Sequence, residues 1–273
     1  MPAQSRAIRR GYAAFAVLAI GFITLPLVFI VWMSFFSNKI LSFPPQGYTL
    51  DWYLRAWELS DFRNGFFLSI RTSLIATGIA LVLGLPASFT LARTRFKGRE
   101  AINTVLMSPV IVPGIVGGSA LFVFFLEVEF LTGWRIAGTS AGLLVAHGLI
   151  ALPWMIRLVT TALISVNPSV EEAARSLGAG PLTVFWRITL PVIKPGVIAG
   201  SILVFIPSLG AYVTPSVLGG GKNMMLGNLI ELQFGQGRNW PLGSAISITL
   251  MAMVMIALLA YVRNAGSSEV RHG

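Results

Sequence analysis

Residues Ser165–Pro195 read SVNPSVEEAARSLGAGPLTVFWRITLPVIKP, a stretch of charged and helix-capping residues between two long apolar tracts. Its first half predicts a short helix, because Asn167 is a good N-cap residue and Pro168 follows at the first helical position. Gly178 stands where the C′ glycine of such a helix is expected. The stretch is therefore predicted to present a compact, capped helix rather than a flexible loop.

Two further details of this stretch bear on its local structure. Ser169, with Glu172 three residues later, offers an alternative capping box at the start of the helix. A second short helix is predicted to start at Pro181 and to stop by Pro191, because proline favours a first turn and breaks a helix interior.

The apolar tracts around this stretch are long enough to cross a bilayer, which takes about 20 mostly apolar residues. The chain has 273 residues, of which 55% are hydrophobic and only 11% charged, whereas a soluble domain carries about 25% charged residues. We therefore predict an all-α membrane protein and exclude a soluble enzyme, a coiled coil and a disordered tail. Six transmembrane helices are expected within residues 12–262, at approximately 12–36, 65–92, 101–126, 140–164, 196–217 and 241–262.

The distribution of charge predicts the orientation, because short loops rich in Lys and Arg stay on the cytoplasmic side. With the N-terminus inside, the inner segments hold 12 of the 20 Lys and Arg but only four of the ten acids. Arg71 and Arg157 lie within helix ends and are expected to snorkel. Both termini are thus predicted to be cytoplasmic, as segments 1–11 and 263–273, together with the loop 165–195.

One outer loop carries a second amphipathic pattern. Within residues 49–59, an apolar stripe is formed by Leu50, Tyr53, Leu54 and Trp57. We expect a short helix that either lies at the outer membrane interface or forms a docking shelf for an outer partner.

The short helix predicted after Asn167 also has an apolar face, on which half of the residues are small. Val170, Ala173, Ala174 and Leu177 recur at the i, i+3, i+4, i+7 spacing of one helix face. Because two of these residues are alanines, the surface of another protein could approach the backbone closely.

The motif Glu172-Ala173-Ala174, followed after three residues by Gly178 and then by Ile188 and Leu190-Pro191, resembles the EAA loop of ABC-importer permeases. The resemblance implies a type I ABC-importer permease fold with six transmembrane helices in a bacterial inner membrane. It also implies that this helix is the coupling helix, which in that family rests in a cleft of a cytoplasmic ATPase subunit.

The resemblance assigns roles to individual residues of the coupling loop. It implies that Glu172 is the acidic residue at the ATPase contact and that Gly178 makes the sharp turn that frees the helix end. Leu190 and Pro191 would anchor the loop to the fifth transmembrane helix. We add Glu171 and Arg175 as expected polar contacts; the alternative is that Glu171, Glu172 and Arg175 form only a solvated helix face.

The chain is not expected to hydrolyse ATP, because a phosphate-binding loop needs G-x-x-x-x-G-K-[ST] and the Gly221-Lys222 pair is followed by Asn223. We expect two cytoplasmic ATP-binding subunits, a second permease that is identical or homologous, and an extracytoplasmic substrate-binding protein. The absence of Cys and the separation of His147 from His272 predict no metal, cofactor or catalytic site. No nucleic-acid partner is expected, because the basic residues cluster between apolar tracts.

Most of the chain, and most strongly the part from Pro168 to Arg263, resembles permeases of the spermidine/putrescine importer group. The resemblance rests on several short features, namely Pro207 with Gly210, Thr214-Pro215, Leu218-Gly219-Gly220, Gly227-Asn228, Gln233-Phe234 and Asn239-Trp240-Pro241. It implies a polyamine as the transported solute. The alternatives are another small solute, such as an anion, iron or an amino-acid-like compound, and, with less support, a stand-alone secondary transporter.

Five residues are candidates for the substrate passage, namely Pro207, Gly210, Tyr212, Glu231 and Gln233. A polycation in an apolar passage must meet carboxylates, carbonyls or aromatic faces, which these residues supply. Proline and glycine in one span could also unwind it and free carbonyl groups. The alternatives are a packing kink, an interfacial tyrosine and a hydrogen bond in an outer loop.

Overall fold

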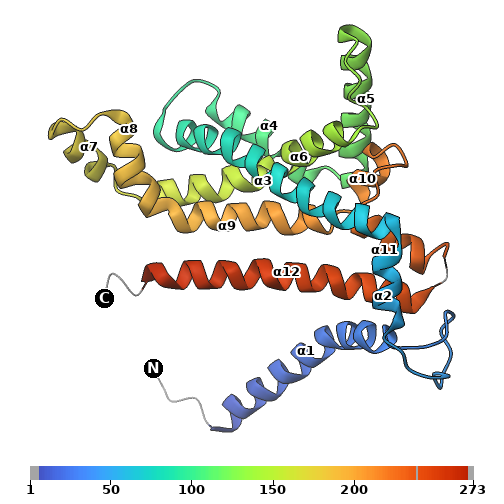
Figure 1. Cartoon of the computed structure of the whole chain (residues 1–273). Helices are drawn as coiled ribbons and strands as arrows, with labels where there is room; N and C mark the ends of the chain where they lie inside the picture. The colour runs from blue at the N-terminus through green and yellow to red at the C-terminus, as the bar shows by residue number, and fades with distance from the viewer. Residues whose placement is uncertain (1–5, 238, 270–273) are drawn as a thin grey trace. The chain divides into compact units, whose positions relative to one another are not determined.

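The computed structural model describes residues 6–237 and 239–269, and these residues are largely helical (Figure 1). The elements in chain order are α1 (Arg6–Met33), α2 (Asp51–Glu58), α3 (Ser60–Arg93), α4 (Arg99–Ile111), α5 (Gly114–Thr132), α6 (Ser140–Ser165), α7 (Pro168–Ser176), α8 (Pro181–Val184), the π-helical segment η1 (Phe185–Thr189), α9 (Leu190–Leu209), α10 (Val213–Leu218), α11 (Leu226–Phe234) and α12 (Trp240–Glu269).

Six helical stretches in the described part of the chain are long and apolar enough to cross a membrane. They are Arg10–Met33, Ser60–Arg93, Gly114–Thr132, Ser140–Ser165, Pro181–Leu209 and Trp240–Arg263. The prediction of an all-α protein with six transmembrane helices is confirmed. Some of the basic residues that entered the orientation prediction are not placed, because residues 1–5, Arg238 and residues 270–273 lie outside the described residues.

The third span differs from the predicted tract 101–126. The helix breaks at Val112 and Pro113, so that α4 covers 13 residues and the membrane-length helix is α5. The reason is local, since a residue before proline is driven to extended angles and Val112 has φ −75° and ψ 131°. At about 1.5 Å per residue, α4 is about 20 Å long, which is less than the hydrocarbon thickness.

The fifth span also differs from the prediction. The second short helix starts at Pro181 as predicted, but no non-helical residue separates it from the span, because α8, η1 and α9 follow one another over Pro181–Leu209 with a bend between α8 and α9 (Figure 1). The π turn of η1 widens the helix just before Pro191, which relieves the clash of the proline ring with the preceding turn. The run ends at Gly210 instead, so the predicted span 196–217 is divided between α9 and α10.

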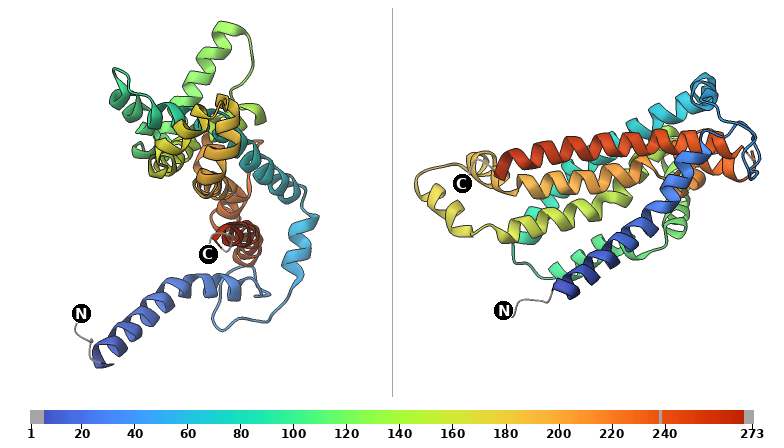
Figure 2. Two further views of the ribbon diagram at one scale, coloured as in Figure 1. Left: turned by 90° about the vertical axis from the view of Figure 1, so that its left-hand side faces the viewer. Right: turned by 90° about the horizontal axis from the view of Figure 1, so that it is seen from below.

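The described residues form two compact units, the larger comprising residues 60–229 and 250–269. Its centre is the packed set α3, α6 and α9, which lie side by side (Figures 1 and 2). Small residues let these helices approach closely. A Cβ atom built on Gly84 would lie 2.8 Å from Cγ of Met155, and one built on Gly200 would lie 2.8 Å from its sulfur. Met155 is fully buried between the two glycines and joins all three helices.

The smaller unit comprises residues 6–59, 230–237 and 239–249. Its α2 helix buries Trp52, whose indole Nε1 donates a hydrogen bond to the carbonyl of Phe36 at 2.7 Å. The apolar residues Leu50, Leu54 and Trp57 of the predicted stripe are exposed. The structure thus shows the predicted short helix, with these three residues of the stripe exposed and the fourth, Tyr53, half-buried and hydrogen-bonded to Ser34.

Candidate functional site

The helix α7 is capped at both ends by local hydrogen bonds. The side-chain oxygen of Asn167 accepts from the backbone N–H of Ser169 at 3.1 Å, so Asn167 is the N-cap and Ser169 lies within the helix. At the other end Gly178 has φ 85°, its N–H donates to the carbonyl of Arg175 at 2.9 Å, and the N–H of Ala179 donates to that of Ala174 at 3.1 Å. This pair of bonds is a Schellman motif. The helix therefore has defined ends.

Most of the α7 surface is not covered by the described residues. Glu172, Ala173 and Arg175 are exposed, Ala174 is half-buried, and Leu177 just after the helix is 89% exposed. The motif residues thus lie where another protein could reach them.

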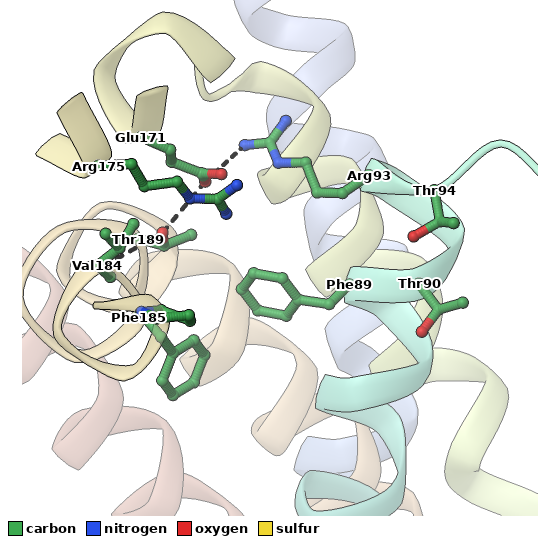
Figure 3. Close-up of a pocket in the computed structure, with 10 residues that line it drawn as sticks. Phe89, Thr90, Arg93, Thr94, Glu171, Arg175, Val184, Phe185 and Thr189 are labelled. Carbon is green, nitrogen blue, oxygen red and sulfur yellow. Dashed lines mark hydrogen bonds and ion pairs between the residues drawn. The ribbon is translucent and has the colours of Figure 1, made fainter. Parts of the chain in front are cut away.

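Glu171 is the exception and differs from our expectation of an outward polar contact. It is the only buried residue of α7, all of whose residues the structure describes. Its Oε1 accepts hydrogen bonds from Nη2 of Arg93 at 3.0 Å and from the hydroxyl of Thr189 at 3.1 Å (Figure 3). Arg93 is the last residue of α3, and Thr189 is the last residue of η1. The carboxylate therefore points into the chain.

A cavity of about 290 Å³ adjoins this group (Figure 3). Its polar lining includes the side chains of Arg93, Arg175 and Thr94, and Phe89 and Phe185 form its apolar wall. Those two aromatic rings meet edge to face, with their centroids 5.3 Å apart. Arg175 thus lines a cavity beside the buried carboxylate while the residue as a whole remains exposed.

The two residues expected to anchor the loop have different surroundings. Leu190 packs against the buried cluster formed by α3, α6 and α9. Pro191 is exposed in the first turn of α9. The packing contact of the anchor is therefore made by Leu190.

Three of the passage candidates gather where α9 ends. Pro207 is exposed in the last turn of α9, Gly210 is the C-cap residue, and Tyr212 precedes α10 with 43% of its surface exposed. Glu231 and Gln233 lie on α11 in the smaller unit, where Glu231 is exposed and Gln233 is half-buried.

Sequence reasoning missed Asn228, which connects the two sides of the helix break between α9 and α10. The side-chain amide of Asn228 donates to the carbonyl of Tyr212 at 3.2 Å and to the hydroxyl of Ser216 at 2.8 Å, and its oxygen accepts from the N–H of Met225 at 3.1 Å. A Cβ on Gly227 would lie 2.5 Å from the carbonyl oxygen of Ala211. The Gly-Asn pair was visible in the sequence, and glycine beside a polar residue is a signal of close backbone approach.

Arg93 and Thr189 were also missed as site residues. Arg93 entered the sequence reasoning only as one basic residue of an inner loop, and it lies 78 positions from Glu171. The available signal was the acidic pair Glu171-Glu172. Because adjacent residues on a helix face different directions, the two carboxylates cannot both lie on the same outward face.

Comparison with known proteins agrees with this architecture. The family model described as "Binding-protein-dependent transport system inner membrane component" matches residues 80–267. The spermidine/putrescine transport system permease protein PotB of Escherichia coli (strain K12) is 33% identical over 253 residues, which are 89% of this chain and 92% of that protein. The molybdenum transport system permease protein ModB of Mycobacterium tuberculosis (strain ATCC 25618 / H37Rv) is 29% identical over 219 residues, which are 77% of this chain and 82% of that protein.

Solved structures show the same fold. A chain of a bacterial ABC transporter involved in the import of the acidic polysaccharide alginate has a TM-score of 0.72 at 18% identity, covering 95% of this chain and 98% of that chain. A chain of the MetNI methionine ABC transporter in an inward-facing conformation has a TM-score of 0.61 at 22% identity, covering 75% of this chain and 94% of that chain.

The expected ABC-importer permease fold is therefore confirmed, and the protein is a multi-pass protein of a bacterial inner membrane. Its relatives are permease subunits rather than enzymes, which makes it a non-catalytic membrane component. The chain belongs to the family of inner membrane components of binding-protein-dependent transport systems.

Proposed function

We propose that the chain is a permease subunit of an ATP-driven importer that carries polyamines of the spermidine and putrescine type. The observation that carries the proposal is the 33% identity to PotB, which extends over 253 residues. The similarity is not confined to the coupling loop that many importers share, since it spans 89% of the chain.

The coupling function is proposed for α7. A short helix with both ends capped transmits a displacement better than a flexible loop, and its exposed Glu172 and Ala173 suit a socket on an ATPase subunit. Arg175 would add a polar contact at the same surface, and Gly178 and Leu190-Pro191 would set the turn and the anchor. Glu171 is not part of this surface, because its side chain is buried within the chain.

The assembly follows from this role. Two nucleotide sites need two ATP-binding subunits, each with its own coupling helix, so a second permease copy or homologue completes the pore. A substrate-binding protein delivers the solute on the outer face. Both termini and α7 would then lie in the cytoplasm, as the loop charges predict.

The passage candidates are proposed for each unit separately, namely the break after α9 in the larger unit and the second half of α11 in the smaller one. The carbonyl groups near Gly210 and the exposed ring of Tyr212 offer partners to an ammonium group. Pro207 precedes this break, and Glu231 with Gln233 supplies a carboxylate and an amide. These groups could accept a polycation without holding it tightly, which leaves selection to the binding protein.

A second candidate function is the import of a small oxyanion. Arg71 and Lys222 are exposed and line a cavity of about 360 Å³ together with Asn64 and Asn223. Two cations at one cavity favour an anion, and the 29% identity to ModB is in line with such a solute. A neighbouring cavity of about 300 Å³ adds the carboxylate of Asp61, which reduces this preference.

Uptake by the complete importer in proteoliposomes distinguishes the two functions. We expect ATP-dependent accumulation of labelled spermidine, competed by putrescine and not by molybdate. Glu231→Gln should reduce spermidine uptake, whereas Arg71→Gln, as the matched charge-removing control, should not. Uptake of molybdate that is lost in Arg71→Gln, with no uptake of spermidine, would replace the first function by the second.

A further inference from the structure

One carboxylate joins the coupling helix to the three central helices. Glu171 on α7 accepts from Arg93 and Thr189, and Nη2 of Arg93 also donates to the carbonyl of Val166 at 3.3 Å. Val166 is the C-cap residue of α6. These residues, Arg93, Glu171, Thr189 and the Val166 carbonyl, are called the polar junction below.

The polar junction meets the ends of three spans. Arg93 ends α3, Val166 follows α6, and Thr189 immediately precedes α9. These are the helices that pack around Met155 in the core of the larger unit. A force applied to α7 can therefore reach all three helices through this group of hydrogen bonds, in addition to the chain connections at both ends of α7.

The remaining attachment of α7 is slight. Its other residues are exposed apart from half-buried Ala174, and its larger packing contacts with described elements are with α8 and η1. Both of these elements belong to the helical run that continues into α9. The ion pair between Glu171 and Arg93 links α7 to α3 directly.

The chemistry of the polar junction favours a positioning role over a stabilising one. The side chains of Arg93 and Glu171 are only 20% and 7% exposed, and a buried ion pair can often be replaced by apolar residues without loss of stability. What charged hydrogen bonds supply is a fixed direction and a short distance between the groups. An apolar contact in the same place would allow α7 to slide.

We propose that Arg93, Glu171 and Thr189 are positioning residues that lock α7 to α3, α6 and α9, so that the coupling helix and the core move as one body. The inference rests on the proposed coupling function, because the ATPase subunits supply the movement. Loss of the polar junction would leave ATP hydrolysis possible but poorly connected to opening of the passage.

The first test uses an isosteric pair at Thr189. Thr189→Val removes the hydroxyl and keeps the shape, whereas Thr189→Ser keeps the hydroxyl. In proteoliposomes we expect the valine variant to import about tenfold less spermidine per ATP hydrolysed, the effect of losing one hydrogen bond to a charged group, and the serine variant to behave like the wild type. An unchanged ratio in Thr189→Val would overturn the proposal. So would a fall in uptake and hydrolysis by the same factor.

The second test measures the rigidity of the link without any solute. The chain has no cysteine, so spin labels at Leu177→Cys and Val192→Cys report only the distance between the α7 end and α9. Both positions are exposed. We expect one narrow distance distribution in the assembled importer, the same without nucleotide and after trapping with ATP and vanadate. A distance that changes on trapping in the wild type contradicts a rigid link.

The double variant Arg93→Met with Glu171→Met disrupts the polar junction in the second test. Replacing only one of these two residues would leave a buried charge without its partner, which can prevent folding. The double variant removes both charges together, so no unpaired buried charge remains. We expect it to insert normally, with a broadened distribution between the labels. Arg95→Met is the matched control, because Arg95 is exposed in the loop that follows α3. A narrow distribution in the double variant would overturn the proposal, whereas absence of any ATP-dependent uptake by the wild type would count against the proposed function alone.

Discussion

Gly148 of α6 faces Ile79 of α3 so closely that a Cβ atom on Gly148 would lie 2.7 Å from Cγ2 and 2.8 Å from Cβ of Ile79. Because Cβ is attached directly to the backbone, Ile79 cannot swing away as a flexible side chain would. The missing side chain at position 148 is therefore what sets the separation of the two helices at this level.

We expect Gly148→Ala to push α3 and α6 apart and to lower the stability of the chain by about 1–3 kcal/mol, as overpacking does in other cores. The measurement is the thermal unfolding midpoint of the detergent-solubilised protein. Gly78→Ala is the matched control, since a Cβ there would meet nothing within 4 Å. An equal effect of Gly78→Ala and Gly148→Ala would contradict this packing.

The left-handed backbone at Gly178 predicts that substitutions there reduce uptake by graded amounts. It has φ 85° and nothing within 4 Å of a built Cβ, so a substitution there meets conformational strain without crowding. We expect Gly178→Ala to cost about 1–2 kcal/mol in the turn, and Gly178→Asn to cost less because asparagine tolerates left-handed angles. ATP-dependent uptake should therefore fall from glycine to asparagine to alanine. The reverse order of asparagine and alanine would count against the capped-helix account.

Reversal of the charge at Glu172 tests the exposed face of α7. Because Glu172 is exposed on α7, Glu172→Lys should leave the amount of protein in the membrane unchanged. It should nevertheless abolish uptake and uncouple ATP hydrolysis, since it places a cation at the proposed ATPase contact. Glu100→Lys, at an exposed acid on α4, is the control. Normal solute-stimulated ATP hydrolysis in Glu172→Lys would exclude the contact.

Asn228 predicts a local effect at the break after α9. Asn228→Ala leaves the buried N–H of Met225 without its side-chain acceptor, a loss of about 1–3 kcal/mol, and removes one of the two side-chain donors to the carbonyl of Tyr212. We expect faster amide hydrogen exchange over residues 210–216, measured by mass spectrometry, while exchange in α3 and α6 is unchanged. Uniform acceleration across the chain would mean that the residue supports the whole fold instead.

The parts of the fold that depend on neighbouring residues were predictable. The N-cap at Asn167 and the C′ glycine at 178 act within a few residues, and the structure shows both. The break at Val112 was equally local, because a residue before proline avoids the helix, and the prediction there failed by giving hydropathy more weight than backbone sterics. The helix through Pro191 was not predictable in this way, since a π turn that admits proline has no sequence rule of comparable strength.

The two adjacent acids show where reading the site from sequence reaches its limit. Glu171 and Glu172 are chemically alike, and helix periodicity requires them to face different directions without saying which one is buried. The answer depends on Arg93 and Thr189, which lie 78 and 18 positions away. Such pairings arise from the packing of α3 against α6 and α9, and no local pattern encodes them.

The helical run from Pro181 to Leu209 has a mechanical consequence. Figure 1 shows that the run bends between α8 and α9, so its straight part is α9. The 20 residues of α9 span about 30 Å at about 1.5 Å per residue. A tilt of α9 by about 5° about its first turn would carry its other end, next to the break at Gly210, through about 2.6 Å. In the proposed importer, a small movement of α7 would therefore shift the backbone at this break.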